Sequence, residues 1–250
     1  MAIPIIYDSK VLDETFGLNK ALQEINVDNQ GRWILNHGTP LSLAFLCHRI
    51  NTQIAELEKT FSNLVLENPY ATTINIQEPK TDLEKTAWEL YHLIKIDVFL
   101  FYTFLRSLFD EFNLYVIQPN IKGDGAKLRN SFNEIRKANA ENPKWKNHCD
   151  FIDNTLQPLH KEFGNNIRDT RDILVHHSAQ INMKRSNTGQ YFFAILTEDE
   201  IMELNDKTED PRLRWKPFES LNELIELTFY IFGQFTQYIK TKKSQNPATQ

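Results

Sequence analysis

A short stretch of the chain gathers four side chains that could act together on a phosphate group: Arg171, Asp172, His176 and His177. A group that titrates near neutrality can move protons, and a fixed guanidinium can stabilise developing anionic charge. These residue types therefore suit phosphate chemistry that uses no metal ion. The alternative is a charged helix face whose residues pair with one another and catalyse nothing, each pair contributing about 0.3–0.5 kcal/mol.

A helix is needed to position this cluster, and its phase separates two sets of side chains. Steps of four, three and four residues define a buried stripe: Phe163, Ile167, Thr170 and Leu174. A second set repeats every four residues on the other side: Arg168, Asp172 and His176. Arg171 lies between the two sets, nearer the stripe. We therefore expect the polar cluster to point out of its own bundle, toward a groove, solvent or a second subunit.

The spacing within the cluster suggests a division of roles. Asp172 and His176 are four residues apart and can form a hydrogen bond, which would fix the orientation of the imidazole. Arg171 is close enough to bind a phosphate presented to His176. For RNA the economical reaction is attack by the substrate's own 2′-hydroxyl. His176 would then act as general base or acid, and Arg171 would stabilise the pentacovalent phosphorane.

The sequence Arg171-Asp172-Ile-Leu-Val-His176 resembles the signature of the HEPN superfamily, in which an arginine and a polar residue precede a histidine. The resemblance covers roughly residues 40 to 240. It implies a helical bundle, a homodimer in which two motif copies form one composite site, and metal-independent endoribonuclease activity of the kind found in toxin–antitoxin and phage-defence systems. Arg171 would match the motif arginine, Asp172 the polar residue and His176 the histidine.

Two further residues are candidates for substrate binding. His177 could replace His176 if the longer spacing is used, and Arg168 shares the helix face with the cluster although it matches nothing in the signature. Asp172 and His176 could instead supply two metal ligands one turn apart, joined by His177 or His160. No dense metal-binding motif accompanies them, so we expect neither a metal ion nor a cofactor.

The remaining sequence predicts the helices that would carry this site. Thr39-Pro40 opens an amphipathic helix that runs to about Glu67. Thr81 to Glu84 forms a capping box, and the helix that follows continues to roughly Tyr115. Further helices are predicted over residues 125–140, from Pro143, through the Arg171 cluster, and from about Ser220 to Lys240.

A β-hairpin interrupts this helical pattern. Strand-like runs at 180–185 and 190–196 flank Ser186 to Gly189, and residues 212–218 could add a strand. The fold class is therefore mainly α, an up-and-down bundle of four to five long helices with a small hairpin insert. We expect an N-terminal extension (1–38) packed on the bundle, a helical domain (39–242) with the insert at about 180–197, and a disordered tail (243–250).

Composition limits the compartment and the partners. The 250 residues carry a formal net charge of −5, with a basic segment at 122–146 and an acidic one at 198–210. No signal-peptide pattern is expected at the amino terminus, and the most apolar run, 98–105, is far shorter than the roughly 20 residues of a spanning helix. Cys47 and Cys149 suggest reduced thiols. We expect a cytoplasmic protein that does not enter membranes.

Two functions from different classes remain. The first is a homodimeric, metal-independent endoribonuclease that acts on RNA through Arg171 and His176, with an antitoxin or accessory protein as a further partner. The second is a non-catalytic helical module for protein interaction or nucleotide binding. A cluster closed within one chain would favour the second function, whereas two His176 side chains at one groove of a dimer would favour the first.

Overall fold

The computed structural model describes residues 20–21, 23–24, 39–67, 79–118, 167, 169–176, 179–186, 188–197 and 215–245. The helices predicted at 125–140 and from Pro143 lie outside these residues, as does nearly all of the predicted extension at 1–38.

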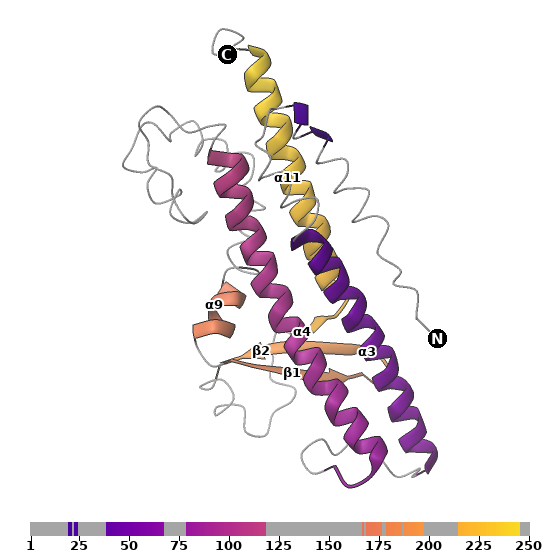
Figure 1. The fold of residues 1–250 in the computed structure, drawn as a ribbon. Helices are drawn as coiled ribbons and strands as arrows, with labels where there is room; N and C mark the ends of the chain where they lie inside the picture. The colour runs from indigo at the N-terminus through magenta and orange to yellow at the C-terminus, as the bar shows by residue number, and fades with distance from the viewer. Residues whose placement is uncertain are drawn as a thin grey trace. The chain divides into compact units, whose positions relative to one another are not determined.

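Helix α3 spans Thr39–Glu67, the bounds that the sequence predicts (Figure 1). Its apolar side chains recur at three- and four-residue steps, so they form one stripe along the helix. The stripe is buried at Leu43, Leu46, Ile50 and Leu57, and Ile54 between the last two is half-buried. This burial, more than helix propensity, stabilises a helix of this length.

Helix α4 spans Asp82–Phe112 and begins with the predicted capping box. The backbone N–H of Glu84 donates to Thr81 Oγ1 at 3.2 Å, and the Glu84 carboxylate accepts from the backbone N–H groups of Thr81 (2.9 Å) and Lys80 (2.8 Å). These bonds lower the pKa of Glu84. The α-helical pattern ends at Phe112, and a π-helical turn, η1 (Asn113–Ile117), replaces the last predicted α-helical residues.

The predicted hairpin is confirmed and extends to a three-stranded antiparallel sheet. Strands β1 (Gln180–Arg185) and β2 (Tyr191–Leu196) pair over their full length, and β3 (Lys216–Pro217) pairs with β2 on its other side. The strand expected at 212–218 is paired only at Lys216 and Pro217. Gly189 in the turn has φ 84°, a conformation that other residues rarely adopt.

Helix α11 spans Ser220–Gln245 and is longer than the sequence predicts. Its buried face carries three phenylalanines, Phe229, Phe232 and Phe235. The first three residues of the predicted disordered tail, 243–245, are therefore helical, and the other tail residues lie outside the described part of the chain.

The chain divides into two compact units. One consists of Met1–Ala44, Thr103–Asp169 and Glu223–Gln250, and the other of Phe45–Tyr102 and Thr170–Asn222. In the first unit, the rings of Phe112 and Phe232 stack with centroids 3.7 Å apart. In the second unit, the sheet contacts α3 and α4, and both the hairpin and the Arg171 cluster belong to it.

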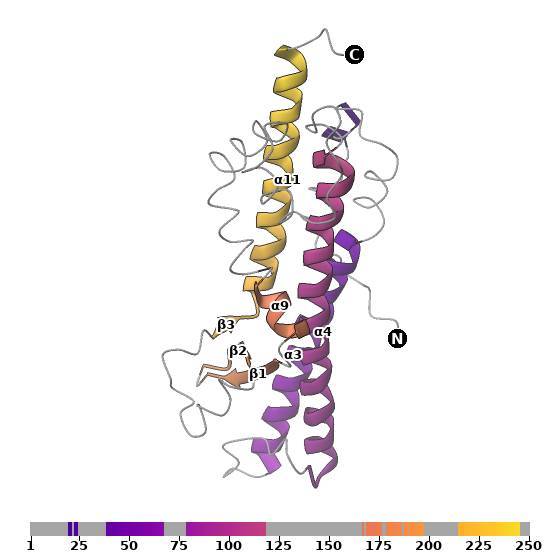
Figure 2. The ribbon, with the colours of Figure 1, turned by 90° about the vertical axis from the view of Figure 1, so that its left-hand side faces the viewer.

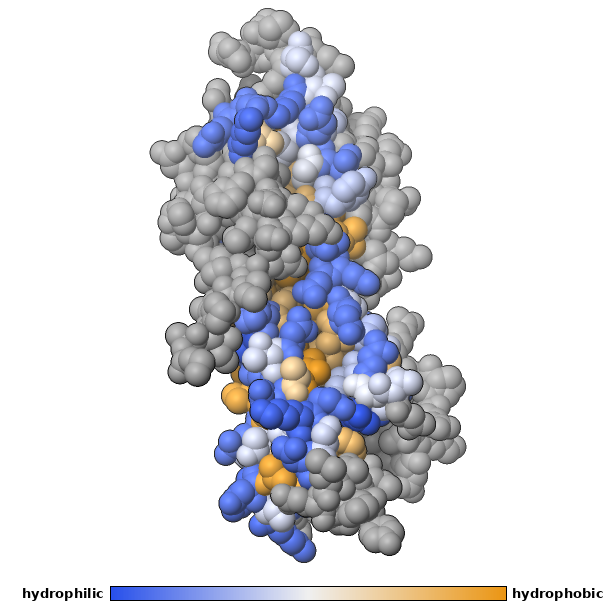
Figure 3. Space-filling view, turned by 90° about the vertical axis from the view of Figure 1, so that its right-hand side faces the viewer, coloured by the Kyte–Doolittle hydropathy of each residue, from blue (hydrophilic) through white to orange (hydrophobic). Residues whose placement is uncertain are grey.

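These elements confirm a mainly α fold with a small β insert. Apolar side chains reach the surface among hydrophilic ones on the face shown in Figure 3. On α4 the exposed apolar side chains include Trp88, Leu93 and Ile96. Among the described helices, none is both long enough and apolar enough to cross a membrane.

Candidate functional site

The Arg171 cluster lies on a short helix, α9 (Asp169–His176), that leads directly into β1 (Figure 2). Thr170 and Leu174 are buried on this helix, and Ile167 just before it is buried as well. These three residues confirm the predicted stripe, whose fourth member, Phe163, lies outside the described residues. His176 is exposed and Arg171 is half-buried, as the helical phase predicts.

Arg171 is the centre of the cluster. Its Nη1 atom donates to Asp172 Oδ1 at 3.0 Å and lies 3.3 Å from His176 Nε2. The predicted hydrogen bond from the His176 imidazole to the Asp172 carboxylate is not formed; Arg171 contacts both residues instead. Because a guanidinium can only donate, His176 accepts at Nε2 in this arrangement and carries its ring proton on Nδ1.

Most donors of Arg171 remain open. A guanidinium has five N–H donors, and the two on Nη1 account for both contacts of Arg171. Its Nε and Nη2 atoms find no acceptor in the part of the chain that the structure describes. This edge of the guanidinium matches two oxygens of a carboxylate or phosphate. The Arg171 side chain is 31% exposed and that of Asp172 45%, so both side chains reach solvent.

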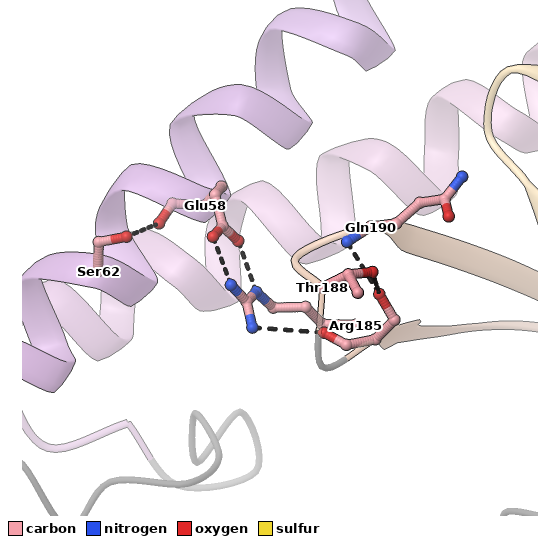
Figure 4. A network of polar contacts seen from close by, with 6 residues as sticks. Glu58, Ser62, Arg185, Thr188 and Gln190 are labelled. Atoms are coloured by element: carbon pink, nitrogen blue, oxygen red, sulfur yellow. Dashed lines mark hydrogen bonds and ion pairs between the residues drawn. The ribbon is translucent and has the colours of Figure 1, made fainter.

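Two other arginines of the same unit use this edge for structure. Arg185 on β1 donates from Nε to Glu58 Oε2 at 2.6 Å and from Nη2 to Glu58 Oε1 at 2.5 Å (Figure 4). Arg49 on α3 donates from Nε to Asp97 Oδ2 at 2.6 Å, and its Nη2 binds Asp97 Oδ1. In both arginines, the Nε/Nη2 edge binds a carboxylate that is distant in the sequence. No described residue binds the same edge of Arg171.

These two ion pairs were not predictable from local sequence patterns. The Asp97 side chain is only 1% exposed and lies in the most apolar part of α4, so a cationic partner could have been expected. The identity of that cationic partner could not have been predicted, because Arg49 is 48 residues away from Asp97 in the sequence. Nothing in the local pattern distinguishes Arg185 from Arg171 either. Only the fold shows that, among the described residues, a carboxylate distant in the sequence faces Arg185, whereas Arg171 meets only that of its neighbour Asp172.

The remaining candidates contribute less to this site. Arg168, His177 and His160 lie outside the described residues. Asp172 and His176 form no group of three metal-binding side chains with any residue that the structure describes. His92 was expected at a core or boundary position but is exposed, and its ring lies 4.4 Å from that of Trp88. Cys47 is buried, as expected of a structural thiol.

Comparison of the chain with models of protein families, with curated proteins and with solved structures finds no match. The geometry of the Arg171 cluster and the residues that compose it are therefore what indicates a function.

Proposed function

We propose that the protein is a HEPN-like, metal-independent endoribonuclease that acts as a homodimer, with Arg171 and His176 in its active site. The observation that supports the proposal most is the open Nε/Nη2 edge of Arg171, which lies beside an exposed imidazole. An arginine that is positioned but not saturated is suited to hold an anion during a reaction.

In this proposal the phosphate of the scissile bond binds the open edge of Arg171. His176 Nε2 then takes the proton of the adjacent 2′-hydroxyl, whose oxygen attacks phosphorus. The bond from phosphorus to the 5′-oxygen breaks, and a protonated imidazole donates to that leaving oxygen. The products are a 2′,3′-cyclic phosphate and a 5′-hydroxyl, so atoms and charges balance without a further reactant.

Asp172 has a different role in this scheme from the one its spacing suggests. It binds Nη1 of Arg171, the atom that also contacts His176, so it positions the guanidinium rather than the imidazole. Its negative charge lies near the phosphate and opposes binding. A second copy of the cluster, supplied by a homodimer, would add another Arg171 to offset that charge.

The family resemblance also suggests a cytoplasmic protein of a toxin–antitoxin or phage-defence system, with an antitoxin or accessory protein as partner. Arg168 and His177 would bind the substrate next to the cluster, since they flank it in the sequence. These assignments depend on the nuclease activity and are to be tested after it.

One observation favours a non-catalytic module for protein interaction or nucleotide binding. Arg171 already contacts Asp172 and His176 within a single chain, so these three side chains have polar partners without a substrate. The 3.3 Å contact to His176 is long for a hydrogen bond, and both partners are accessible to solvent. A nucleotide could therefore bind the open edge without being cleaved.

Cleavage of single-stranded RNA in the presence of EDTA tests the proposal. We expect cleavage by the wild-type protein, cyclic phosphate ends on the products, and rates lower by about 100-fold or more for Arg171→Ala and for His176→Ala. Undiminished cleavage in both variants would exclude the site. A wild-type chain that binds RNA but leaves it intact would favour the non-catalytic module.

A further inference from the structure

The alternation of the strands gives the sheet two different faces. One faces α3 and α4: Arg185 binds Glu58, and the backbone of Met183 hydrogen-bonds the Tyr91 hydroxyl. Side chains next to these in sequence point the other way. This opposite side, here called the outer sheet face, carries Gln180, Asn182, Lys184, Phe192 and Trp215, together with Ala194 and Leu196, which are buried.

Lys184 and two aromatic rings form the centre of the outer sheet face. Lys184 and Phe192 are cross-strand partners. The Lys184 Nζ atom lies 5.9 Å from the centroid of the Phe192 ring and 4.5 Å from that of Trp215. Lys184 is exposed and forms no ion pair with any carboxylate that the structure describes, so its positive charge is not neutralised there.

Three polar groups on this face also have open hydrogen-bonding capacity. The side chains of Gln180 and Asn182 form no hydrogen bond with any residue in the described part of the chain. The indole N–H of Trp215 is buried and has no acceptor there either. The buried indole N–H is closed to solvent, so the amide groups of the exposed Gln180 and the half-buried Asn182 are the ones that a ligand can reach.

We propose that the outer sheet face binds single-stranded RNA, with bases stacked on Phe192 and Trp215 and a phosphate held by Lys184. Phe192 and Trp215 are half-buried, so each ring keeps some exposed surface. Aromatic rings, amide side chains for base edges and a lysine for the backbone are the groups that such a ligand requires. A duplex cannot use the rings, because its bases are already stacked and paired.

Chain connectivity relates this face to the Arg171 cluster. Gln180 follows His176 by four residues, so their backbones are at most about 14 Å apart. A short oligonucleotide can therefore reach from the outer sheet face to the cluster. In naming RNA as the ligand, this inference rests on the proposed function, but binding to the face does not require cleavage.

Electrostatics predicts how such binding depends on salt. The connection from β2 to β3 contains an acidic segment, 198–210, with seven acidic residues and one lysine. Long-range attraction of a polyanion is therefore weak, and stacking must supply most of the affinity. With Lys184 as the main phosphate contact, log K should fall with log salt concentration with a slope of only about −0.7.

The test is binding of a short, labelled, 2′-O-methyl single-stranded RNA to the full-length protein, measured by fluorescence anisotropy. This RNA lacks the 2′-hydroxyl and cannot be cleaved by the proposed reaction. We expect Trp215→Leu to weaken binding by about tenfold, and Lys184→Gln by about threefold. Trp88→Leu and Lys59→Gln remove an exposed tryptophan and an exposed lysine elsewhere in the same unit, and should leave binding unchanged.

Equal affinity of wild-type, Trp215→Leu and Lys184→Gln proteins would overturn the inference, as would equal affinity for single-stranded and duplex RNA. Binding that depends on Trp215 and Lys184, in a protein that cleaves no RNA, would support the outer sheet face and refute the nuclease. Cleavage that requires Arg171 and His176, with binding insensitive to Trp215 and Lys184, would support the nuclease and refute RNA binding at the outer sheet face.

Discussion

Arg171 on α9 and Arg185 on β1 are both next to a carboxylate in the second unit, yet their surroundings differ. Arg185 meets Glu58, a residue 127 positions away, through two short hydrogen bonds that use its whole Nε/Nη2 edge. Arg171 meets Asp172, its neighbour in sequence, through one bond that leaves that edge open. The first arginine connects the hairpin to α3, whereas the Nε and Nη2 atoms of the second have no acceptor among the described residues.

The difference shows why residue type alone does not identify a functional arginine. Both guanidiniums are about one third exposed, at 31% for Arg171 and 29% for Arg185. The two arginines differ in which of their N–H donors form hydrogen bonds and in which acceptors those donors meet. A bidentate ion pair between residues far apart in the sequence stabilises tertiary structure, while an ion pair between sequence neighbours contributes little to stability.

The largest expected effect is on cleavage. Arg171→Ala should reduce the rate of RNA cleavage by about 100-fold or more, because the phosphate loses its ligand in the transition state. Its free energy of unfolding should change by no more than about 0.5 kcal/mol. Cleavage kinetics and urea denaturation of the same preparation measure both quantities. A large loss of stability in Arg171→Ala would assign this arginine a structural role like that of Arg185.

Arg185→Ala should show the opposite behaviour. Removal of two short hydrogen bonds to a charged group should lower the free energy of unfolding by about 2 kcal/mol. Urea denaturation measures this loss, and a double-mutant cycle with Glu58→Ala isolates the pair from other effects. A coupling energy near zero would show that Glu58 and Arg185 do not hold the hairpin to α3.

The same pair should make stability depend on pH. The hydrogen bond from Arg185 holds the pKa of Glu58 below its ordinary value of 4.5. A carboxylate with a depressed folded pKa stabilises the protein above its unfolded pKa, and this contribution is lost as the pH falls through the folded value. The stability advantage of wild type over Glu58→Gln should be full at neutral pH and decrease below about pH 4.5. An advantage that stays constant down to about pH 3 would contradict this account.

A smaller effect is expected from the turn that presents Arg185. In Gly189→Ala the new Cβ would lie 3.3 Å from Arg185 Nη2 at a φ of +84°, so we expect a loss of about 1 kcal/mol. Gly233→Ala is the matched control. Its Cβ meets nothing within 4 Å, and alanine in a helix should add up to about 1 kcal/mol. Thermal denaturation of both variants would show shifts in opposite directions; a stabilised Gly189→Ala would contradict the turn geometry.

The elements were predictable from the sequence where local chemistry determines them. Thr81 and Glu84 defined the start of α4, and Gly189 marked the hairpin, because capping and turn formation need only nearby residues. The end of α4 was not predictable, since the π-helical turn at Asn113 has no local signature that we can name. Likewise, the extension of α11 beyond Lys240 was not predictable, because the residues there are polar and show no helical pattern of apolar side chains.

The candidate site was predictable only in part. Helical phase correctly placed Thr170 and Leu174 inside and His176 outside, because the period of a helix is fixed. The predicted hydrogen bond within the cluster was wrong. Spacing alone favoured Asp172 as the partner of His176, but the long side chain of Arg171 contacts both Asp172 and His176. Side-chain reach and the location of distant carboxylates such as Glu58 depend on the fold, so local spacing could not supply them.

The most direct test of the central claim compares wild-type Arg171 with Arg171→Lys in single-turnover RNA cleavage with EDTA. Lysine keeps the positive charge but has no planar fork, so it cannot reproduce the open Nε/Nη2 edge. We predict that cleavage by Arg171→Lys is slower by about 30-fold or more at unchanged stability. Cleavage at the wild-type rate would show that charge alone suffices and would contradict the role assigned to that edge.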